Sequence, residues 1–264
     1  MIKLLGIPYD ANSSFLTGAA LAPGKIREME NCGSANRFCE NGKEIKPGNC
    51  YLDLGDMKFH SKDRQSAYEQ IKQTIQKELK ESSKVISIGG DHSISFPVIE
   101  AFTKFYDGLN VLHIDAHSDL YEDFENNPYS HASPFARLME QRRVHSLTQV
   151  GIRCQTTHLN EQSAKFKVKV IEMKDFDFSF ISDLKAPLYI SLDMDVLDPA
   201  FAPGVSHHEP GGMSTRQLIT IIQSIKVDIV GADIVELNPN RDVNDRTAMV
   251  AYKLFKELAS KMII

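Results

Sequence analysis

Acidic and histidine side chains recur at a spacing of two residues after two apolar segments of the sequence. Asp115, His117 and Asp119 follow the first segment, and Asp193 and Asp195 follow the second. In an extended chain alternate side chains point to the same side, so each set should converge on one face. Carboxylates and imidazoles bind divalent metals, and carboxylates held this close repel one another unless a cation neutralises them. The spacing therefore predicts a metal site.

A third set of residues supports the same prediction. A histidine follows the sequence Gly-Gly-Asp, again after an apolar segment. Parallel α/β sheets bind their ligands where strands end and loops begin, which would bring the three sets together. Taken singly, each set also fits a helix start, a core histidine or a turn. Together, four aspartates balance two divalent cations that share carboxylates. The predicted ligands are His92, Asp115, His117, Asp119, Asp193 and Asp195.

Two further residues could act on a substrate beside such a centre. Glu236 ends another apolar segment, and a free carboxylate can pair with a guanidinium group through two hydrogen bonds. Asp233 lies in the same segment, and we interpret it as a structural carboxylate or one that supports the metal ligands. His131 could carry a proton to a leaving amine. The alternative for His131 is a loop histidine that is hydrogen-bonded to the backbone.

These side chains must be positioned by elements that end near one another. Short apolar runs, several of them continuous and β-branched, are typical of strands buried on both faces of a parallel sheet. We predict strands at 3–8, 49–54, 84–88, 109–114, 147–151, 168–171, 188–192 and 228–234. Segments with helical character lie between them, which predicts helices on both faces of the sheet. These segments are 61–82, 95–105, 134–143 and 246–262.

The remaining segments complete a predicted single domain over residues 1–264. Ser214 and Gln217 have the spacing of a capping box at the start of a further helix. Residues 198–213 are rich in proline and glycine, and we predict that they form a long loop that leaves a strand. Residues 31–46 carry no strong chemical pattern and predict a surface excursion.

Composition excludes several classes of function. The 264 residues carry a formal charge of −5, so no basic stripe is available to neutralise nucleic-acid phosphates. The first residues predict a strand rather than a signal peptide, and no apolar run is long enough to span a membrane. Cys32, Cys39, Cys50 and Cys154 show no Cys-x-x-Cys spacing. Reduced thiols and a cytoplasmic location are therefore predicted.

Five motifs resemble the signatures of one enzyme family, the ureohydrolases, which include arginases and agmatinases. They are GGDHS (89–93), DAHSD (115–119), SLDMDVLDPAFAPG (191–204), PGG (210–212) and DIVELNP (233–239), in that order. The resemblance covers nearly the whole chain and is greatest to plant-type arginases and to agmatinases. It implies a three-layer α/β/α sandwich with a mostly parallel sheet of about eight strands. It also implies a homo-oligomer, either a trimer or a hexamer.

The same resemblance assigns roles to the candidate residues. It implies two Mn²⁺ ions, with Co²⁺ or Ni²⁺ as alternatives, that share Asp115 and Asp193. His92 and Asp119 would complete the first site, and His117 and Asp195 would complete the second. Asp119, His131 and Glu236 match catalytic positions of the family: a metal ligand, a proton-shuttle histidine and a guanidinium-binding glutamate. The implied reaction is attack of a metal-bridging hydroxide on a guanidino group, which yields urea and a primary amine.

The substrate is the least determined part of the prediction. Arginine carries an α-carboxylate that agmatine lacks, and Asn126, Asn127 and Ser130 could donate hydrogen bonds to it. The alternative is that these are polar turn residues, and three acidic residues at 122, 123 and 125 would favour agmatine. We place arginine ahead of agmatine, then guanidinobutyrate, then formiminoglutamate. A catalytically silent metal-binding subunit and a different hydrolase on the same scaffold are the remaining alternatives.

Overall fold

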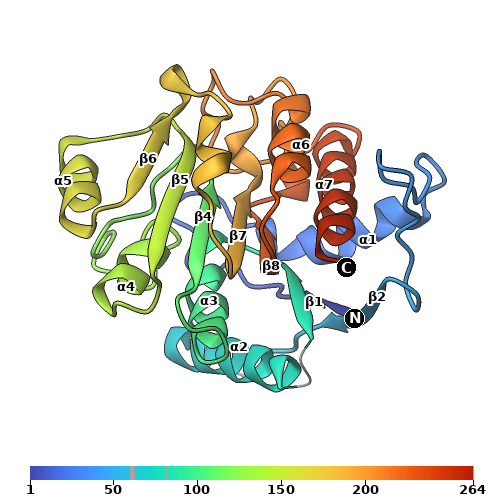
Figure 1. Cartoon of the computed structure of the whole chain (residues 1–264), viewed down its shortest axis with the longest axis horizontal. Helices are drawn as coiled ribbons and strands as arrows, with labels where there is room; N and C mark the ends of the chain where they lie inside the picture. Colours follow the sequence, from blue (N-terminus) through green and yellow to red (C-terminus); the bar gives the residue numbers. More distant parts are fainter. Residues whose placement is uncertain (60–62, 81–82, 264) are drawn as a thin grey trace.

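One parallel sheet organises the molecule (Figure 1). The computed structural model describes residues 1–59, 63–80 and 83–263. Within these ranges eight strands form the sheet in the order β2-β1-β3-β8-β7-β4-β5-β6, and every neighbouring pair is parallel. All eight predicted strands are confirmed, with ends shifted by no more than two residues. They are β1 (Ile2–Gly6), β2 (Tyr51–Asp56), β3 (Lys84–Ile88), β4 (Asn110–Ile114), β5 (Ser146–Ile152), β6 (Lys169–Glu172), β7 (Leu188–Asp193) and β8 (Ile229–Val235).

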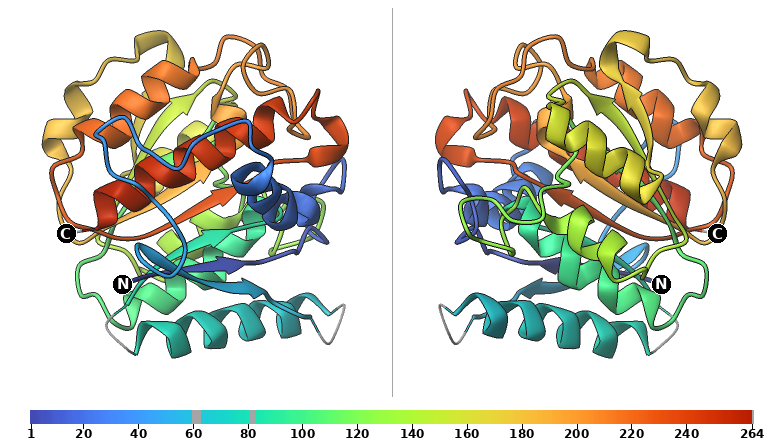
Figure 2. Two further views of the ribbon diagram at one scale, coloured as in Figure 1. Left: turned by 90° about the vertical axis from the view of Figure 1, so that its right-hand side faces the viewer. Right: turned by 90° about the vertical axis from the view of Figure 1, so that its left-hand side faces the viewer.

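Helices cover both faces of this sheet and make the three-layer sandwich that was predicted (Figure 2). α1, α6 and α7 pack with one apolar core, and α2, α3, α4 and α5 pack with the other. The described residues form seven α-helices: α1 (Ala22–Asn31), α2 (Arg64–Leu79), α3 (Ser95–Thr103), α4 (Pro134–Glu140), α5 (Thr157–Phe166), α6 (Thr215–Ser224) and α7 (Arg246–Met262). Short 3₁₀ helices include η2 (His92–Ile94), η5 (Met194–Val196) and η6 (Pro239–Arg241).

The four predicted helical segments correspond to α2, α3, α4 and α7. The outermost residues of the segment 61–82 lie outside the described residues. The capping box before α6 is confirmed, because the side chains and backbone amides of Ser214 and Gln217 hydrogen-bond reciprocally. α1 and α5 were not predicted. The loop at 198–213 is confirmed, since no helix or strand interrupts it and its end is held where the Met213 amide donates to the Val196 carbonyl.

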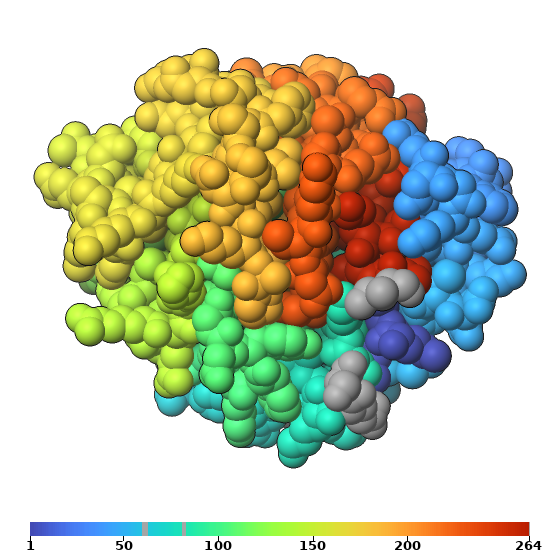
Figure 3. Space-filling model, in the orientation of Figure 1, coloured from blue at the N-terminus to red at the C-terminus, as the bar shows by residue number. Residues whose placement is uncertain are grey.

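Residues 31–46 lie largely on the surface, as predicted, but they also cover α7 (Figure 3). The Cys39 thiol donates to the Lys256 carbonyl at 3.1 Å, and Lys256 Nζ donates to the Asn36 carbonyl at 2.6 Å. Asn41 Nδ2 donates to Ser260 Oγ at 2.6 Å. This cover explains why α7 is buried around most of its circumference, polar residues included.

Two further observations concern the cysteines and the helices. All four cysteines fall within the described residues, and all four are free. No helix in the described ranges is both long and apolar enough to cross a membrane.

Candidate metal centre

The candidate ligands gather at the carboxyl ends of β3, β7 and β4, and β8 lies between β3 and β7 at the middle of the sheet. His92 follows β3 through a Gly-Gly turn that passes close to the first loop of the chain. At Gly90 a Cβ atom would lie 1.8 Å from the Tyr9 carbonyl oxygen, so no other residue fits there. Asp115 directly follows β4, and Asp193 is the last residue of β7. Parallel strands therefore bring these residues together at the carboxyl end of the sheet, as the sequence predicted.

Each strand exit is shaped by its own carboxylates. The Asp115 side chain accepts a hydrogen bond from the His117 amide at 2.6 Å, and Asp193 accepts one from the Asp195 amide at 2.7 Å. These local bonds turn the chain so that alternate side chains face the same space. Asp119 adopts a positive φ of 50°, a left-handed conformation that costs a non-glycine residue about 1 kcal/mol.

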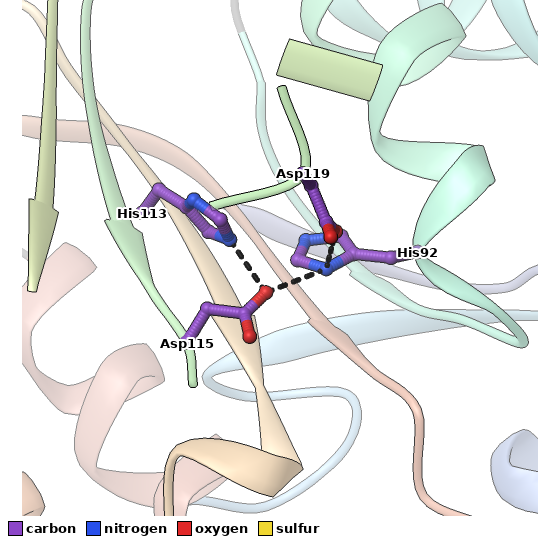
Figure 4. A group of neighbouring side chains, drawn as sticks. All are labelled: His92, His113, Asp115 and Asp119. Carbon is purple, nitrogen blue, oxygen red and sulfur yellow. Dashed lines mark hydrogen bonds and ion pairs between the residues drawn. The ribbon is translucent and has the colours of Figure 1, made fainter. Parts of the chain in front are cut away.

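Two clusters of ligand atoms share the Asp115 carboxylate, and Figure 4 shows the one that contains His92 and Asp119. His92 Nδ1 lies 3.0 Å from Asp115 Oδ2, 3.1 Å from Asp119 Oδ2 and 3.1 Å from Asp193 Oδ2. His117 Nδ1 lies 3.0 Å from Asp195 Oδ2 and 3.5 Å from Asp115 Oδ1. Asp115 thus presents one oxygen to each histidine.

The charges of this centre are not balanced by the protein. Asp115, Asp193 and Asp195 are buried, and within the described part of the chain their ion pairs involve histidines only. Burial raises the pKa of Asp193, and the adjacent Asp195 and Asp115 carboxylates raise it further. His92 Nδ1 is also buried, and its nearest charged neighbours among the described residues are the oxygens of Asp115, Asp119 and Asp193. A convergent oxygen and imidazole set with excess negative charge has the chemistry of a divalent-cation site, so the donors present fit a metal.

Glu236 and His131 form a hydrogen-bonded pair beside the aspartates. His131 Nδ1 lies 2.8 Å from Glu236 Oε1, which also accepts from the His92 amide at 2.8 Å. Glu236 follows β8 with a positive φ of 65°, held by a bond from its amide to the Gly90 carbonyl. Burial lowers the pKa of His131, but the Glu236 carboxylate outweighs this effect and raises it to about 9. The Glu236 carboxylate therefore favours the protonated imidazole.

A cavity of about 290 Å³ opens onto both groups. Its lining includes the candidate ligands His117, Asp119, Asp193 and Asp195 together with His131 and Glu236. It also includes residues that the sequence did not indicate: Ser14, Cys154, Thr156, His207 and Glu209. They belong to loops, and no local sequence pattern indicates that these loops come close to the carboxyl end of the sheet.

The loop residues predicted to bind a carboxylate lie beside this cavity. Asn127 and Ser130 line an adjoining cavity of about 130 Å³ that shares Ser14 and Phe124 with the larger one. The Asn127 side chain bonds within its surroundings, accepting from the Tyr129 amide and donating to Asn12. Asn126 is exposed in a left-handed conformation. Their role in binding stays a prediction.

Known proteins resemble this chain along its whole length. It is 46% identical over 275 residues to arginase 1, mitochondrial, of Arabidopsis thaliana, covering 98% of this chain and 80% of that protein. It is 32% identical over 266 residues to an agmatinase of Halalkalibacterium halodurans, covering 97% and 90%. The solved structure of an arginase from Medicago truncatula superposes with a TM-score of 0.94 at 43% identity, covering 99% of this chain and 87% of that one.

These comparisons correct one prediction. The sequence predicted a cytoplasmic location from its reduced cysteines and its first residues. The similar plant arginases are named mitochondrial or chloroplastic/mitochondrial, which contradicts that prediction. Free thiols do not distinguish the cytoplasm from other reducing compartments, so the inference from cysteine usage was too narrow.

The remaining comparison concerns the family. The model of the arginase family matches residues 1–260. That range contains the strand-end carboxylates, the candidate ligands His92 and His117, and the pair formed by His131 and Glu236. The relatives that match most of the chain include both arginases and agmatinases, which hydrolyse guanidino compounds with the help of metals. This chain belongs to the arginase family of metal-dependent ureohydrolases.

Proposed function

We propose that this protein hydrolyses the guanidino group of arginine to urea and a primary amine at a binuclear manganese centre. The observation that carries the proposal is the Glu236–His131 pair, which faces the same cavity as the aspartate cluster. A buried carboxylate beside a metal site suits a cationic guanidinium, whereas an uncharged acyl substrate would gain little from it. This contrast favours a ureohydrolase reaction over other hydrolases on the same scaffold.

The proposed metal ligands divide into two overlapping sets. His92, Asp115, Asp119 and Asp193 would hold one ion, and Asp115, His117, Asp193 and Asp195 would hold the other. The chemistry that two such cations supply is charge neutralisation and a coordinated water whose lowered pKa makes it a nucleophile at neutral pH. Mn²⁺ fits the oxygen and imidazole donors, and Co²⁺ or Ni²⁺ could occupy the same ligands.

The protein's own groups bind and orient the substrate. Glu236 pairs with the guanidinium group and directs the guanidinium carbon toward the aspartates. Substrate binding thus aligns the reacting carbon. The Glu236 carboxylate favours the protonated form of His131, and His131 Nε2 lies 2.8 Å from Ser14 Oγ. It can donate a proton to the departing amine, because a general acid needs a pKa not far above the working pH. Burial of both side chains keeps water away from the reacting nitrogen.

Arginine is the preferred candidate substrate and agmatine the alternative. The chain is 46% identical to a plant arginase and 32% identical to an agmatinase over comparable lengths. Asn127 and Ser130, in the adjoining cavity, would contact the α-carboxylate if the substrate extends past Ser14. We also propose that the protein forms a homo-oligomer, a trimer or a hexamer, and that it has no nucleic-acid or membrane partner.

The first experiment is urea release by Mn²⁺-loaded protein, with arginine and agmatine compared as kcat/KM. A preference for arginine supports the proposal, and a preference for agmatine makes Asn127 an ordinary turn former. Asn127→Ala tests this directly, because only a carboxylate contact would make it raise the KM for arginine and leave agmatine unaffected. Urea from neither substrate would refute the arginase assignment and direct the search to other guanidines.

Glu236→Gln tests the observation that carries the proposal. Removing the charge while keeping the shape should cost about 2–4 kcal/mol, which lowers kcat/KM roughly 30- to 1000-fold. Glu161→Gln, at an exposed position of α5, is the matched control and should change nothing. Unchanged guanidine binding in Glu236→Gln would show that the assigned role is wrong.

A further inference from the structure

A row of polar side chains crosses the otherwise apolar sheet directly beneath the candidate metal centre. The strand register places Gln149 beside His113, His113 beside Ser191, and Ser191 beside Asp233. All four side chains are fully buried. We call them the polar row. Because side chains alternate along a strand, His113 and Ser191 point to the same face as Asp115 and Asp193, two residues further on.

One half of the polar row ends on Asp115. Gln149 Nε2 donates to the Ser118 carbonyl at 2.6 Å, which fixes the amide orientation because a carbonyl can only accept. The same amide group lies 3.0 Å from His113 Nδ1, so this ring nitrogen accepts and Nε2 carries the proton. Nε2 then donates to Asp115 Oδ2 at 2.7 Å (Figure 4). The ring is stacked on Phe135 with centroids 3.8 Å apart, which limits its rotation.

The other half of the polar row ends on His92. His92 Nδ1 faces three aspartates, and its Nε2 lies 2.9 Å from Ser191 Oγ. Ser191 Oγ donates to Asp233 Oδ1 at 2.7 Å, so it accepts from His92 Nε2–H. Tyr189 supplies a second donor to Asp233, at 2.8 Å. In the neutral ring this chain of bonds places the proton on Nε2, so that Nδ1 is the nitrogen that a cation would bind.

We propose that His113 is a positioning residue of the metal centre, and that the polar row orients Asp115 and His92 from inside the sheet. The inference rests on the proposed function. Asp115 offers Oδ2 to the His92 cluster and Oδ1 to the His117 cluster, so the bond from His113 sets the orientation of the one carboxylate that both clusters share. Partners that orient ligands in this way contribute substantially to metal affinity.

The test compares two substitutions at His113. His113→Leu removes the donor to Asp115, whereas His113→Gln keeps an amide N–H within reach of the Nε2 position. Mn²⁺ affinity is measured by calorimetry on chelator-stripped protein, together with the unfolding temperature of the metal-free form. We expect His113→Leu to weaken Mn²⁺ binding by about 10- to 100-fold and His113→Gln to recover most of the loss. Tyr252→Phe removes a buried hydroxyl on α7, far from the row, and should leave affinity unchanged.

Two further measurements separate this inference from its alternatives. If His113→Leu does not fold, Ser191→Ala and Gln149→Met test the two halves separately, and each should weaken Mn²⁺ binding. Parent affinity in these variants, or an equal loss in His113→Gln and His113→Leu, would overturn the positioning role. If the parent protein binds Mn²⁺ and releases urea, and His113→Leu keeps full Mn²⁺ affinity, only the inference about His113 is refuted. A parent protein that binds no divalent cation refutes the proposed function itself.

Discussion

Two regions of this molecule bury charged side chains, and they treat those charges in opposite ways. At the strand ends, Asp115, Asp193 and Asp195 face one another and two histidines. Beneath the segment 31–46, buried Glu257 of α7 accepts hydrogen bonds from the Glu40 amide, Gln223 and Lys253. Lys256, the next buried charge, donates to a backbone carbonyl. We call this second region the α7 cluster.

The pKa values of one carboxyl group from each region, Asp193 and Glu257, shift in opposite directions. Burial raises the pKa of Asp193, and nearby carboxylates add to the effect. Burial also opposes ionisation of Glu257, but hydrogen bonds from Lys253 and Gln223 outweigh it and lower the pKa of that carboxyl. We interpret a buried charge that the protein's own groups neutralise or hydrogen-bond as structural. We interpret a buried carboxylate that faces other carboxylates as a ligand-binding group. The comparison predicts that substitutions in the two regions separate activity from stability.

The largest expected effect on activity comes from Asp193→Asn. Loss of a ligand shared by both proposed ions should lower urea release by more than about 100-fold, the upper cost of losing even an outer partner. The metal-free variant should unfold at a higher temperature than the parent, because a repelled buried charge is gone. With Mn²⁺ the order should reverse, since bound metal stabilises only the parent strongly. Asp183→Asn, at an exposed position, is the control for both scans. Full activity in Asp193→Asn would break the comparison.

Glu257→Gln should show the reverse pattern. The amide group of glutamine would place an N–H donor where the carboxylate oxygen of Glu257 now accepts a hydrogen bond. We therefore expect a loss of about 2 kcal/mol in unfolding free energy. For a chain of this size that lowers the unfolding temperature by roughly 4–8 °C. The kcat/KM for arginine should stay within twofold of the parent. Glu28→Gln, whose side chain is 64% exposed, should leave stability unchanged. A loss of activity in folded Glu257→Gln would contradict a purely structural role.

The destabilisation by Glu257→Gln should depend on pH. The pKa of Glu257 is lower in the folded protein than in the unfolded chain, where glutamate titrates near about 4.3. Its contribution to stability is therefore fully present above that value and is lost as the pH falls through the folded pKa. Chemical unfolding of the parent and the variant from pH 7 downward should show a constant difference that narrows below about pH 4. If the stability difference between parent and variant widened on acidification, the assigned direction of the Glu257 pKa shift would be wrong.

The smallest effect should come from the exposed edge of the α7 cluster. Glu40 pairs with both terminal nitrogens of Arg216 at 2.7 Å, but the side chains are solvent-exposed. Glu40→Gln should cost less than about 1 kcal/mol, and added salt should reduce the difference further. Denaturant titrations at low and high salt measure it. A loss as large as that of Glu257→Gln would show that burial does not determine the worth of these contacts.

Local sequence patterns predicted the strands and the end of the sheet at which the candidate ligands lie. They did not predict α1, α5 or the loops that surround the site. Short apolar runs, several of them continuous and β-branched, identified all eight strands, and alternation within a strand predicted which acidic side chains face one another. α5 was not predicted because it buries only Leu159, Gln162 and Ser163, so no apolar stripe marks it. α1 begins with Ala-Pro-Gly, a sequence more typical of a turn.

Long-range contacts account for the rest. His113 continues the two-residue spacing of Asp115 and His117 backward, so the signal was present, although its partner Gln149 lies on another strand. Cys154, His207 and Glu209 reach the cavity from loops, and no spacing indicates where a loop will fold. The segment 31–46 appeared featureless because its role depends on contacts with α7, more than 200 residues away in the sequence.

The strand order has a consequence for the biogenesis of the protein. β7 and β8 are synthesised after the other six strands, yet they occupy the middle of the sheet between β3 and β4. While the ribosome is still making residues 188–235, the edges of β3 and β4 carry unpaired backbone groups that can pair with other chains. The sheet can therefore close only after Val235 has been synthesised, and the nascent chain is exposed to aggregation until then. Truncation before β8 would divide the sheet through its centre, where the metal ligands lie.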